Sequence, residues 1–235
     1  MSVASPITEF VGSVKYGDTV GLVIANVDSS LHDNMGLDNG HRSIGIISNR
    51  TGVGSQIMAA DEAVKATNTK VVSIELPRDA KGGAGHGCLI ILAAEDVSDV
   101  RKAVEITLSN TERNFGDVYL FDAGHLDLHY TARASFALNK GFGAPIGKAF
   151  GIIVGAPAGI GVVMADTALK TANVELVNYL SPSSKETSHS NEVTITITGD
   201  SDAVRQSVIA AREVGLSIAK SMGEKPVSIT GKPYI

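Results

Sequence analysis

Tryptophan is absent from the sequence, and aromatic residues of any kind are scarce. Only 5% of the 235 residues are Phe, Trp or Tyr. The 25 glycines make up about 11% of the chain, against a usual share of about 7%. Small side chains must therefore fill much of the core and its close contacts. A chain of 235 residues, 43% of them hydrophobic, is enough for one large domain or for two domains of roughly 100 residues each.

Cysteine is nearly absent as well. Cys88 is the only one, so the chain can form no internal disulfide. The first ten residues, MSVASPITEF, carry Glu9 where a signal peptide would have basic and then apolar residues. We therefore expect a cytoplasmic protein.

Long runs of one charge sign are also missing, and the formal net charge is −5. This distribution gives no electrostatic footprint for nucleic acid or for an anionic membrane surface. The longest uncharged stretch, residues 149–165, is interrupted by glycines and by Pro157. It favours a strand, a turn and the start of a helix over a membrane span. We expect no nucleic-acid or membrane partner.

What the sequence does contain is an internal repeat. The segment AADEAVKATN at 59–68 aligns with MADTALKTAN at 164–173, an offset of 105 residues. IGIIS at 44–48 matches FGIIV at 150–154, and EDVSDVRKAV at 95–104 matches GDSDAVRQSV at 199–208. A weaker match joins 23–36 to 130–143 through Leu31 and Leu138 and through Gly36 and Gly143. A duplicated domain is the working hypothesis.

Each copy shows short apolar runs alternating with helical periodicity. The pattern predicts strands at 71–76, 88–93, 174–177 and 192–198. In the last of these, Val and Ile alternate with Thr194, Thr196 and Thr198, and the threonine face is expected to meet solvent or a helix edge. The first helix of each copy carries a stripe that is expected to face the sheet: Ile57, Ala60 and Val64, or Val162, Ala165 and Leu169. Residues 99–107 and 203–211 predict the second helices.

These segments resemble a known family. The resemblance to the bacterial microcompartment (BMC) shell domain is carried by D-x-x-x-K-x-x-N, by the strand ending in GD before a helix, and by the glycine loop KGGAGHG. Runs such as GDTVGLVIANVDSSLH and GAPIGKAFGIIVGAP are most similar to the tandem shell proteins of propanediol or glycerol utilisation. The tandem shell protein of ethanol utilisation is the next most similar. The resemblance covers nearly the whole chain.

The resemblance implies an α/β (α+β) fold of two tandem, circularly permuted BMC domains, each a small, mainly antiparallel sheet with helices packed on it. We expect domain 1 at residues 1–110 and domain 2 at 111–235. The resemblance further implies a homotrimer that forms a six-sided tile of a cytoplasmic microcompartment shell. Implied partners are other shell proteins, encapsulated enzymes and small polyols such as glycerol or 1,2-propanediol. Neither catalysis nor a cofactor is implied.

Four residues match the tile-edge positions of the family: Lys65, Asn68, Lys170 and Asn173. A lysine stem can lie along a flat neighbouring tile while its ammonium group caps carbonyl groups across the seam. The alternative is a solvated helix face with an Asp–Lys pair at i, i+4, worth about 0.3–0.5 kcal/mol.

The two strand-connecting loops are the candidates for lining a pore or binding a polyol. In the first copy the candidate residues are Lys81, Gly82, Gly83, Gly85 and His86. Glycine is needed in this loop because several copies of it converge on one axis. In the second copy the loop is polar and serine-rich, and its candidates are Ser183, Ser188, His189, Ser190 and Asn191. Hydroxyl groups suit a polyol, which can exchange water for protein hydrogen bonds.

Other interpretations stay open. The glycine loop lacks the G-x-x-x-x-G-K-[ST] pattern of a phosphate-binding loop, yet a cytoplasmic α/β enzyme or a nucleotide-binding regulator using 81–87 is the alternative function. His125, Asp127 and His129 form H-x-D-x-H on one strand face, which makes a metal site conceivable, although a plain polar face is the usual outcome. Cys88 precedes the apolar run LIILAA, which is typical of a small core residue, and cluster binding at a trimer axis is the alternative.

Overall fold

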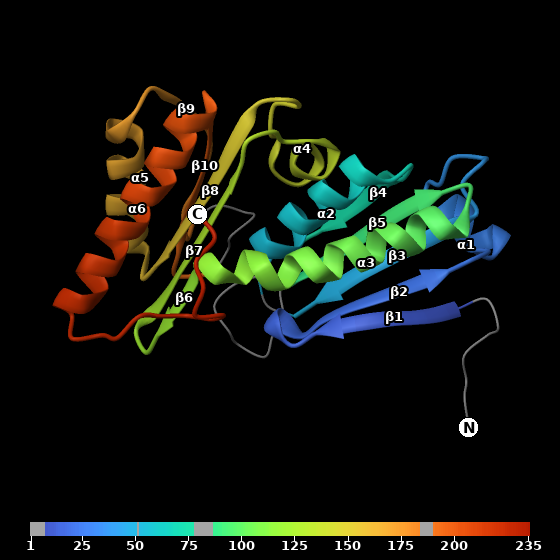
Figure 1. Cartoon of the computed structure of the whole chain (residues 1–235), viewed down its shortest axis with the longest axis horizontal. Coiled ribbons are helices and arrows are strands. Elements are labelled where there is room, and N and C mark those ends of the chain that lie inside the picture. The colour runs from blue at the N-terminus through green and yellow to red at the C-terminus, as the bar shows by residue number, and fades with distance from the viewer. Residues whose placement is uncertain (1–7, 51, 78–86, 184–189) are drawn as a thin grey trace. The chain divides into compact units, whose positions relative to one another are not determined.

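A computed structural model describes residues 8–50, 52–77, 87–183 and 190–235. The chain forms two compact units. The first contains the described residues up to Glu112 together with Ser135–Gly141, and the second contains Arg113–Ala134 and the described residues from Phe142 to Ile235. Each unit is an antiparallel sheet with long helices packed on it (Figure 1).

The sheet of the first unit has the strand order β1-β2-β3-β5-β4. Its strands are β1 (Thr8–Val14), β2 (Thr19–Ile24), β3 (Ser43–Asn49), β4 (Lys70–Glu75) and β5 (Cys88–Ala94). The helices are α1 (Ser29–Asn34), α2 (Gly54–Ala66), α3 (Val97–Asn114) and α4 (Phe136–Phe142), with a 3-10 turn at Tyr16–Asp18.

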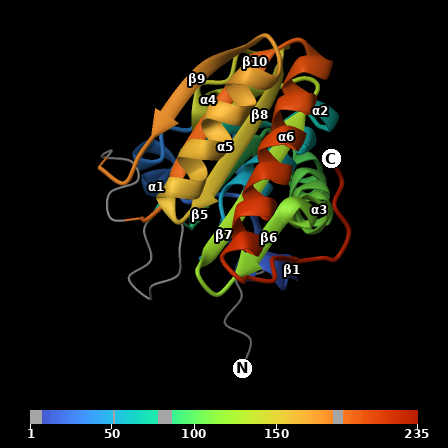
Figure 2. The same cartoon turned by 90° about the vertical axis from the view of Figure 1, so that its left-hand side faces the viewer.

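The sheet of the second unit has the strand order β11-β6-β7-β8-β10-β9. Its strands are β6 (Val118–Phe121), β7 (Gly124–Thr131), β8 (Ala149–Ala156), β9 (Val174–Leu180), β10 (Val193–Gly199) and β11 (Val227–Ser228). Two long helices, α5 (Ala158–Thr171) and α6 (Ser201–Ser221), lie side by side on this sheet (Figure 2), and a 3-10 turn spans Phe115–Asp117.

The two sheets repeat one another strand for strand. The run β2, β3, β5, β4 in the first unit matches β7, β8, β10, β9 in the second, and every pairing is antiparallel. Both edge strands, β4 and β9, carry a register shift at the same place in the repeat. The duplicated antiparallel α/β fold predicted from the sequence is therefore confirmed. The strands predicted at 71–76 and 192–198 are present with bounds shifted by one residue, and the other predicted strands and the second helices are present with longer bounds.

Two glycines show why the sequence is rich in this residue. A Cβ at Gly45 on β3 would lie 2.7 Å from Val104 of α3. A Cβ at Gly151, the matching position on β8, would lie 2.8 Å from Val208 of α6. Because real Cβ atoms do not approach this closely, glycine lets the second helix of each unit lie directly on its sheet. Part of the glycine excess thus serves helix–sheet packing in both copies.

Two expectations about side-chain direction are wrong in part: the threonine face of β10 does not meet solvent, and two of the three residues expected on the inner stripe of α5 are exposed. The threonines of β10 are buried, and Thr196 accepts a hydrogen bond from Asn178 while Thr198 donates one to the carbonyl of Ala149. Hydrogen bonds from neighbouring strands let this face leave solvent. On α5, Val162 and Leu169 are exposed, and Ile160, Met164, Ala165 and Ala168 form the helix's part of the core instead. The helix has two apolar stripes, and periodicity alone does not say which one faces the sheet.

Among the described helices, none has the length and apolar character that crossing a membrane requires.

Candidate functional site

The helix α2 carries a buried carboxylate that holds α4 in place. Asp61 accepts hydrogen bonds from the backbone N–H of Ser135, at 2.9 and 3.0 Å, and of Leu138, at 3.1 Å. Its side chain is 1% exposed. Burial raises the pKa of Asp61 above its ordinary value, against the opposing effects of these hydrogen bonds and of Lys65. Helical periodicity leaves Asp61 outside the apolar stripe of its helix, and the only signal of its role in the sequence is its recurrence as Asp166 in the second copy.

The first tile-edge candidate, Lys65, is bound to carboxylates on its own helix. Its Nζ lies 3.0 Å from Asp61 and 2.9 Å from Glu62, and its side chain is 24% exposed. Because Asp61 is buried, Lys65 offsets a charge that has little water around it. The ammonium group of Lys65 is therefore partly committed within the first unit.

The second candidate, Lys170, has a different environment. Its Nζ lies 2.7 Å from Asp166, but the two side chains are 74% and 60% exposed. Such a solvated pair contributes little to stability and leaves Lys170 able to contact another molecule. Asn68 and Asn173 follow the ends of α2 and α5, and both are exposed. The four edge candidates thus lie at the same end of equivalent helices, with the second pair the more accessible.

The glycine loop candidates Lys81, Gly82, Gly83, Gly85 and His86 lie outside the described residues. The base of that loop is held by one backbone hydrogen bond and one to the side chain of Asn49. Gly87 donates a hydrogen bond to the carbonyl of Pro77 at 2.9 Å, and Asn49 accepts one from the N–H of Cys88 at 2.8 Å. A Cβ at Gly87 would overlap the carbonyl oxygen of Asn49, so glycine is required where the loop returns to β5.

In the second loop, Ser188 and His189 also lie outside the described residues. Ser183 is exposed, and its hydroxyl lies 3.0 Å from that of Ser181. Ser190 is partly exposed, and Asn191 accepts a hydrogen bond from the N–H of Ala158, the first residue of α5, at 3.3 Å. Asn191 therefore anchors the loop to the helix, while Ser183 and Ser190 present hydroxyl groups at its two ends.

The H-x-D-x-H segment on β7 is divided between separate partners. The Nε2 atom of His125 lies 3.3 Å from Glu192, next to the base of the second loop. The Nε2 atom of His129 lies 2.5 Å from Asp127, and its Nδ1 atom lies 3.3 Å from the hydroxyl of Tyr234. Burial would raise the pKa of Asp127, but the neighbouring His129 and His125 hold that pKa below its ordinary value. Within the described ranges, no cluster of three or more His, Cys, Asp or Glu side chains is placed to hold a metal ion.

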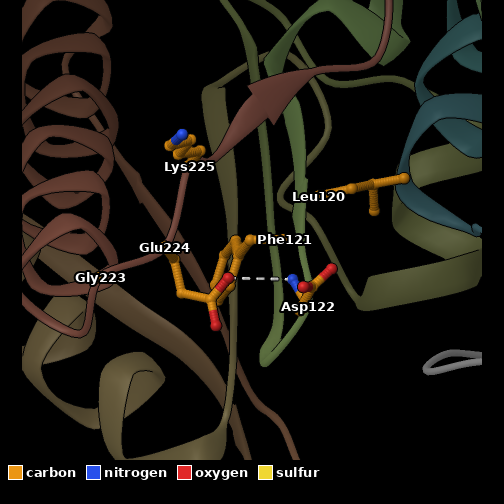
Figure 3. A pocket seen from close by; sticks show the side chains of 6 residues that line it. All are labelled: Leu120, Phe121, Asp122, Gly223, Glu224 and Lys225. Atoms are coloured by element: carbon orange, nitrogen blue, oxygen red, sulfur yellow. Dashed lines mark hydrogen bonds between the residues drawn. The ribbon is translucent and has the colours of Figure 1, made fainter.

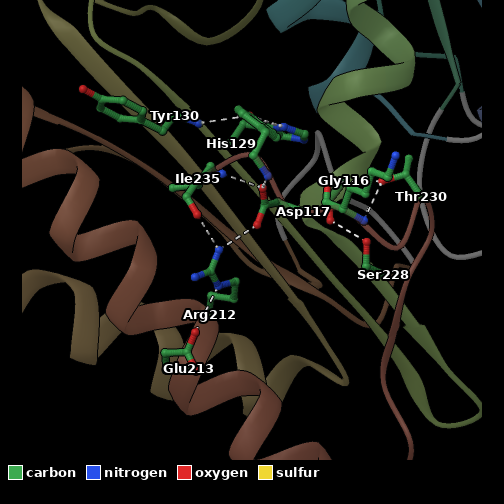
Figure 4. A network of polar contacts seen from close by, with 11 residues as sticks. Gly116, Asp117, His129, Tyr130, Arg212, Glu213, Ser228, Thr230 and Ile235 are labelled. Carbon is green, nitrogen blue, oxygen red and sulfur yellow. Dashed lines mark hydrogen bonds and ion pairs between the residues drawn. The ribbon is translucent and has the colours of Figure 1, made fainter.

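A polar network beside this strand fixes residues 234 and 235. Asp117 accepts hydrogen bonds from the N–H groups of Tyr234, at 2.7 Å, and Ile235, at 3.0 Å, and it pairs with Arg212 at 2.8 Å (Figure 4). The Asp117 side chain is buried, and every contact belongs to the second unit. The network has the character of a structural clamp: it joins the start of the sheet, α6 and the final residues of the chain.

A pocket of about 520 Å³ lies at the turn between β6 and β7. It is lined by Leu120, Phe121, Asp122, Gly223, Glu224 and Lys225 (Figure 3). Glu224 accepts a hydrogen bond from the N–H of Asp122 at 3.1 Å across it. None of the residues predicted from the sequence to act in a site lies in this pocket, and it contains no arrangement of acid, base and nucleophile.

Cys88 is buried at the start of β5. Desolvation raises the pKa of its thiol to about 12, so the thiol stays protonated at neutral pH. This is the environment of a small core residue, as expected from the apolar run that follows it.

Comparison with known proteins identifies the family. The model of the BMC domain matches twice, at residues 43–120 and 149–227. The chain is 64% identical over 220 residues to the bacterial microcompartment shell protein PduB of Citrobacter freundii, covering 94% of this chain and 81% of that protein.

Two solved structures agree closely with the fold. EtuB from Clostridium kluyveri superposes with a TM-score of 0.92 at 63% identity, covering 97% of this chain and 98% of EtuB. A trimeric bacterial microcompartment shell protein PduB superposes with a TM-score of 0.91 at 55% identity, covering 97% and 99%. The tandem repeat, the two antiparallel units and these matches lead to one conclusion. The chain belongs to the BMC-domain family of bacterial microcompartment shell proteins.

Proposed function

We propose that this shell protein forms a homotrimer in which six BMC domains make a six-sided tile. The observation that carries the proposal is the presence of two BMC-domain matches and two matching antiparallel sheets in one chain. Three such chains supply six equivalent sheets, and the solved relative at 55% identity is described as trimeric. The boundaries proposed for the domains are residues 1–110 and 111–235. The role is structural, and no catalytic step is assigned to it.

The proposed passage for metabolites runs beside the two strand-connecting loops, at 81–87 and 181–191. The support is chemical. The first loop is dominated by glycine, and the second by serine and other polar residues. Serine hydroxyl groups such as that of Ser183 can replace the water bound to a polyol at little net cost. Glycerol and 1,2-propanediol are the proposed metabolites.

Tile edges are proposed at Lys65, Asn68, Lys170 and Asn173, where neighbouring tiles and other shell proteins meet. Each edge contact is weak, and repetition around a tile gives assembly its strength. Lys170 is expected to contribute more than Lys65, because its side chain is three times as exposed and its partner Asp166 is solvated. Encapsulated enzymes are the further proposed partners, on a face of the tile.

The assembly proposal is tested on the overexpressed protein. Sedimentation should give a trimer, and electron microscopy should show sheets or tubes. The double variant Lys65→Ala with Lys170→Ala should give dispersed trimers, while Lys220→Ala, near the end of α6, serves as the control and should assemble normally. A stable monomer in the unaltered protein would contradict the proposal, and sheets formed by the double variant would contradict the edge assignment.

A further inference from the structure

The turn that leads into β3 contains the only Asn-Gly step of the sequence, formed by Asn39 and Gly40. The N–H of His41 donates a hydrogen bond to the carbonyl of Asp38 at 2.8 Å, which closes a β-turn with the Asn-Gly step at its two central positions. Both central residues are exposed, so water reaches them in the protomer. The function proposed above makes no use of this turn.

The same turn recurs in the second copy with a different residue at its first central position. The N–H of Lys148 donates a hydrogen bond to the carbonyl of Pro145 at 3.3 Å. Gly147 aligns with Gly40, and Ile146, which is 52% exposed, stands where the first copy has its asparagine. The second turn therefore provides a comparison within the same chain that lacks the side-chain amide.

The glycine N–H groups of the two turns have different partners. The N–H of Gly147 donates a hydrogen bond to the carbonyl of Ala134 at 2.8 Å. In the part of the chain that the structure describes, the N–H of Gly40 has no such acceptor. The backbone differs as well, because Gly147 has a φ of +84° while Gly40 is not in the left-handed region. The nitrogen that follows Asn39 can thus lose its proton without first giving up a hydrogen bond.

We propose that Asn39 is a site of spontaneous deamidation. The backbone nitrogen of Gly40, after its proton passes to water or hydroxide, attacks Cγ of Asn39 and forms a C–N bond. The bond from Cγ to the side-chain nitrogen breaks, and this nitrogen takes up a proton and leaves as ammonia. The product is a cyclic succinimide. Water then opens the ring at either carbonyl, which leaves aspartate or isoaspartate at position 39.

The absence of a side chain at Gly40 favours this ring closure. A Cβ on the residue after the asparagine would shield the attacking nitrogen and restrict the backbone angles that the ring needs. At Gly40 it would also lie 2.9 Å from a carboxylate oxygen of Glu95. The Glu95 side chain is exposed and can turn away, so the substitution Gly40→Ala is compatible with the fold.

Deamidation would add a negative charge where carboxylates already gather. Asp38 precedes the site, and the Glu95 carboxylate lies beside Gly40. Lys70 is bound to Asp38 at 2.8 Å and is placed to offset part of the added charge. Isoaspartate also carries the main chain through its side-chain carbon, which lengthens the turn between the buried Leu37 and the start of β3. The modified chain should therefore bind an anion exchanger more strongly than the unmodified chain.

The test compares the unaltered protein with the variant Ile146→Asn, which places a second Asn-Gly step in the matching turn. Both proteins are held in mildly alkaline buffer, digested with trypsin and analysed by tandem mass spectrometry. The natural site lies in the tryptic peptide 16–42 and the engineered site in the peptide 141–148. Replacement of the amide NH₂ by OH gives a mass gain that fragmentation assigns to one residue. A methyltransferase specific for isoaspartate identifies that product.

In the native protein Asn39 should deamidate, and the engineered site should react about tenfold more slowly, because the N–H of Gly147 must first give up its hydrogen bond. In denaturant the two sites should react at similar rates. Gly40→Ala should slow the reaction at Asn39 in both conditions. An Asn39 that reacts in denaturant but stays intact in the native protein would overturn the inference, and so would equal native rates at the two sites. Neither result bears on the proposed trimer.

Discussion

Asp61 and Asp166 occupy the same position in the two halves of the repeat, yet the first is buried against α4 and the second lies in solvent. Both have a lysine one turn later on the same helix. The difference arises from α4, which comes later in the chain than the rest of the first unit but belongs to it. One carboxylate thus accepts hydrogen bonds from backbone N–H groups of its own chain, and the other pairs with Lys170 at an exposed position.

Loss of the buried carboxylate should destabilise the first unit. Asp61→Ala leaves the N–H groups of Ser135 and Leu138 without their acceptor, and we expect the free energy of unfolding to fall by about 2–4 kcal/mol. Urea unfolding followed by circular dichroism measures the change. The control Glu62→Ala removes the other partner of Lys65 at a half-exposed position and should cost at most about 0.5 kcal/mol. Equal effects of the two substitutions would contradict the role of Asp61.

Adding one methyl group under a second helix should also be costly. Gly151→Ala places a Cβ against Val208 and Val204 of α6, and we expect a loss of about 1–3 kcal/mol through overpacking. Gly159→Ala on α5 is the matched control, because its Cβ would have no neighbour within 4 Å. That change should raise stability by about 0.5–1 kcal/mol, since alanine favours helix more than glycine does. The same urea titration distinguishes the two signs.

Cys88 should be unreactive in the folded protein. Its thiol is buried, and its pKa is raised to about 12, so little thiolate exists at pH 8. With a chromogenic disulfide reagent we expect one thiol per chain to react in denaturant and almost none without it. Rapid reaction of the native protein would place Cys88 at an accessible surface and reopen cluster binding there.

Stability should fall in acid partly because of Asp127. Its pKa is below the ordinary value in the folded protein, so the folded state binds its proton less readily than the unfolded chain, whose Asp pKa is about 3.9. The resulting stability is fully present above that unfolded value and is lost as the pH falls through the folded pKa. Asp127→Asn should therefore flatten the acid side of a plot of unfolding free energy against pH. Asp202→Asn, at an exposed position, should leave the slope unchanged.

Crystals soaked in glycerol or 1,2-propanediol test the proposed passage. Ordered polyol is expected at the glycine loop 81–87 or at the polar loop 181–191, with Ser183 and Ser190 as hydroxyl partners. Replacing both serines with alanine should remove the density at the second loop while the fold is retained. Polyol bound only at unrelated surface positions would remove the support for selective passage.

The sequence by itself determined the duplication, the antiparallel α/β class and the family. The duplication follows from the recurrence of D-x-x-x-K-x-x-N at a fixed offset, and the strands and helices follow from alternation and periodicity within short stretches of chain. The antiparallel class and the family follow from the resemblance of these segments to the BMC shell domain. The buried Cys88 was also predictable, because an apolar strand follows it directly. The edge lysines and the loop candidates rest on matching short motifs of this sequence to the BMC family. They stay predictions.

Only the tertiary structure decided which face of each repeated helix is covered. Periodicity marked Val162 and Leu169 as apolar, but their exposure depends on whether another segment packs there. Asp61 is likewise polar in any local pattern, and its burial is caused by Ser135 and Leu138, more than 70 residues away in the chain. Similar local sequences therefore give one covered helix face and one exposed helix face, because packing of distant segments, and not helical periodicity, fixes which groups leave water.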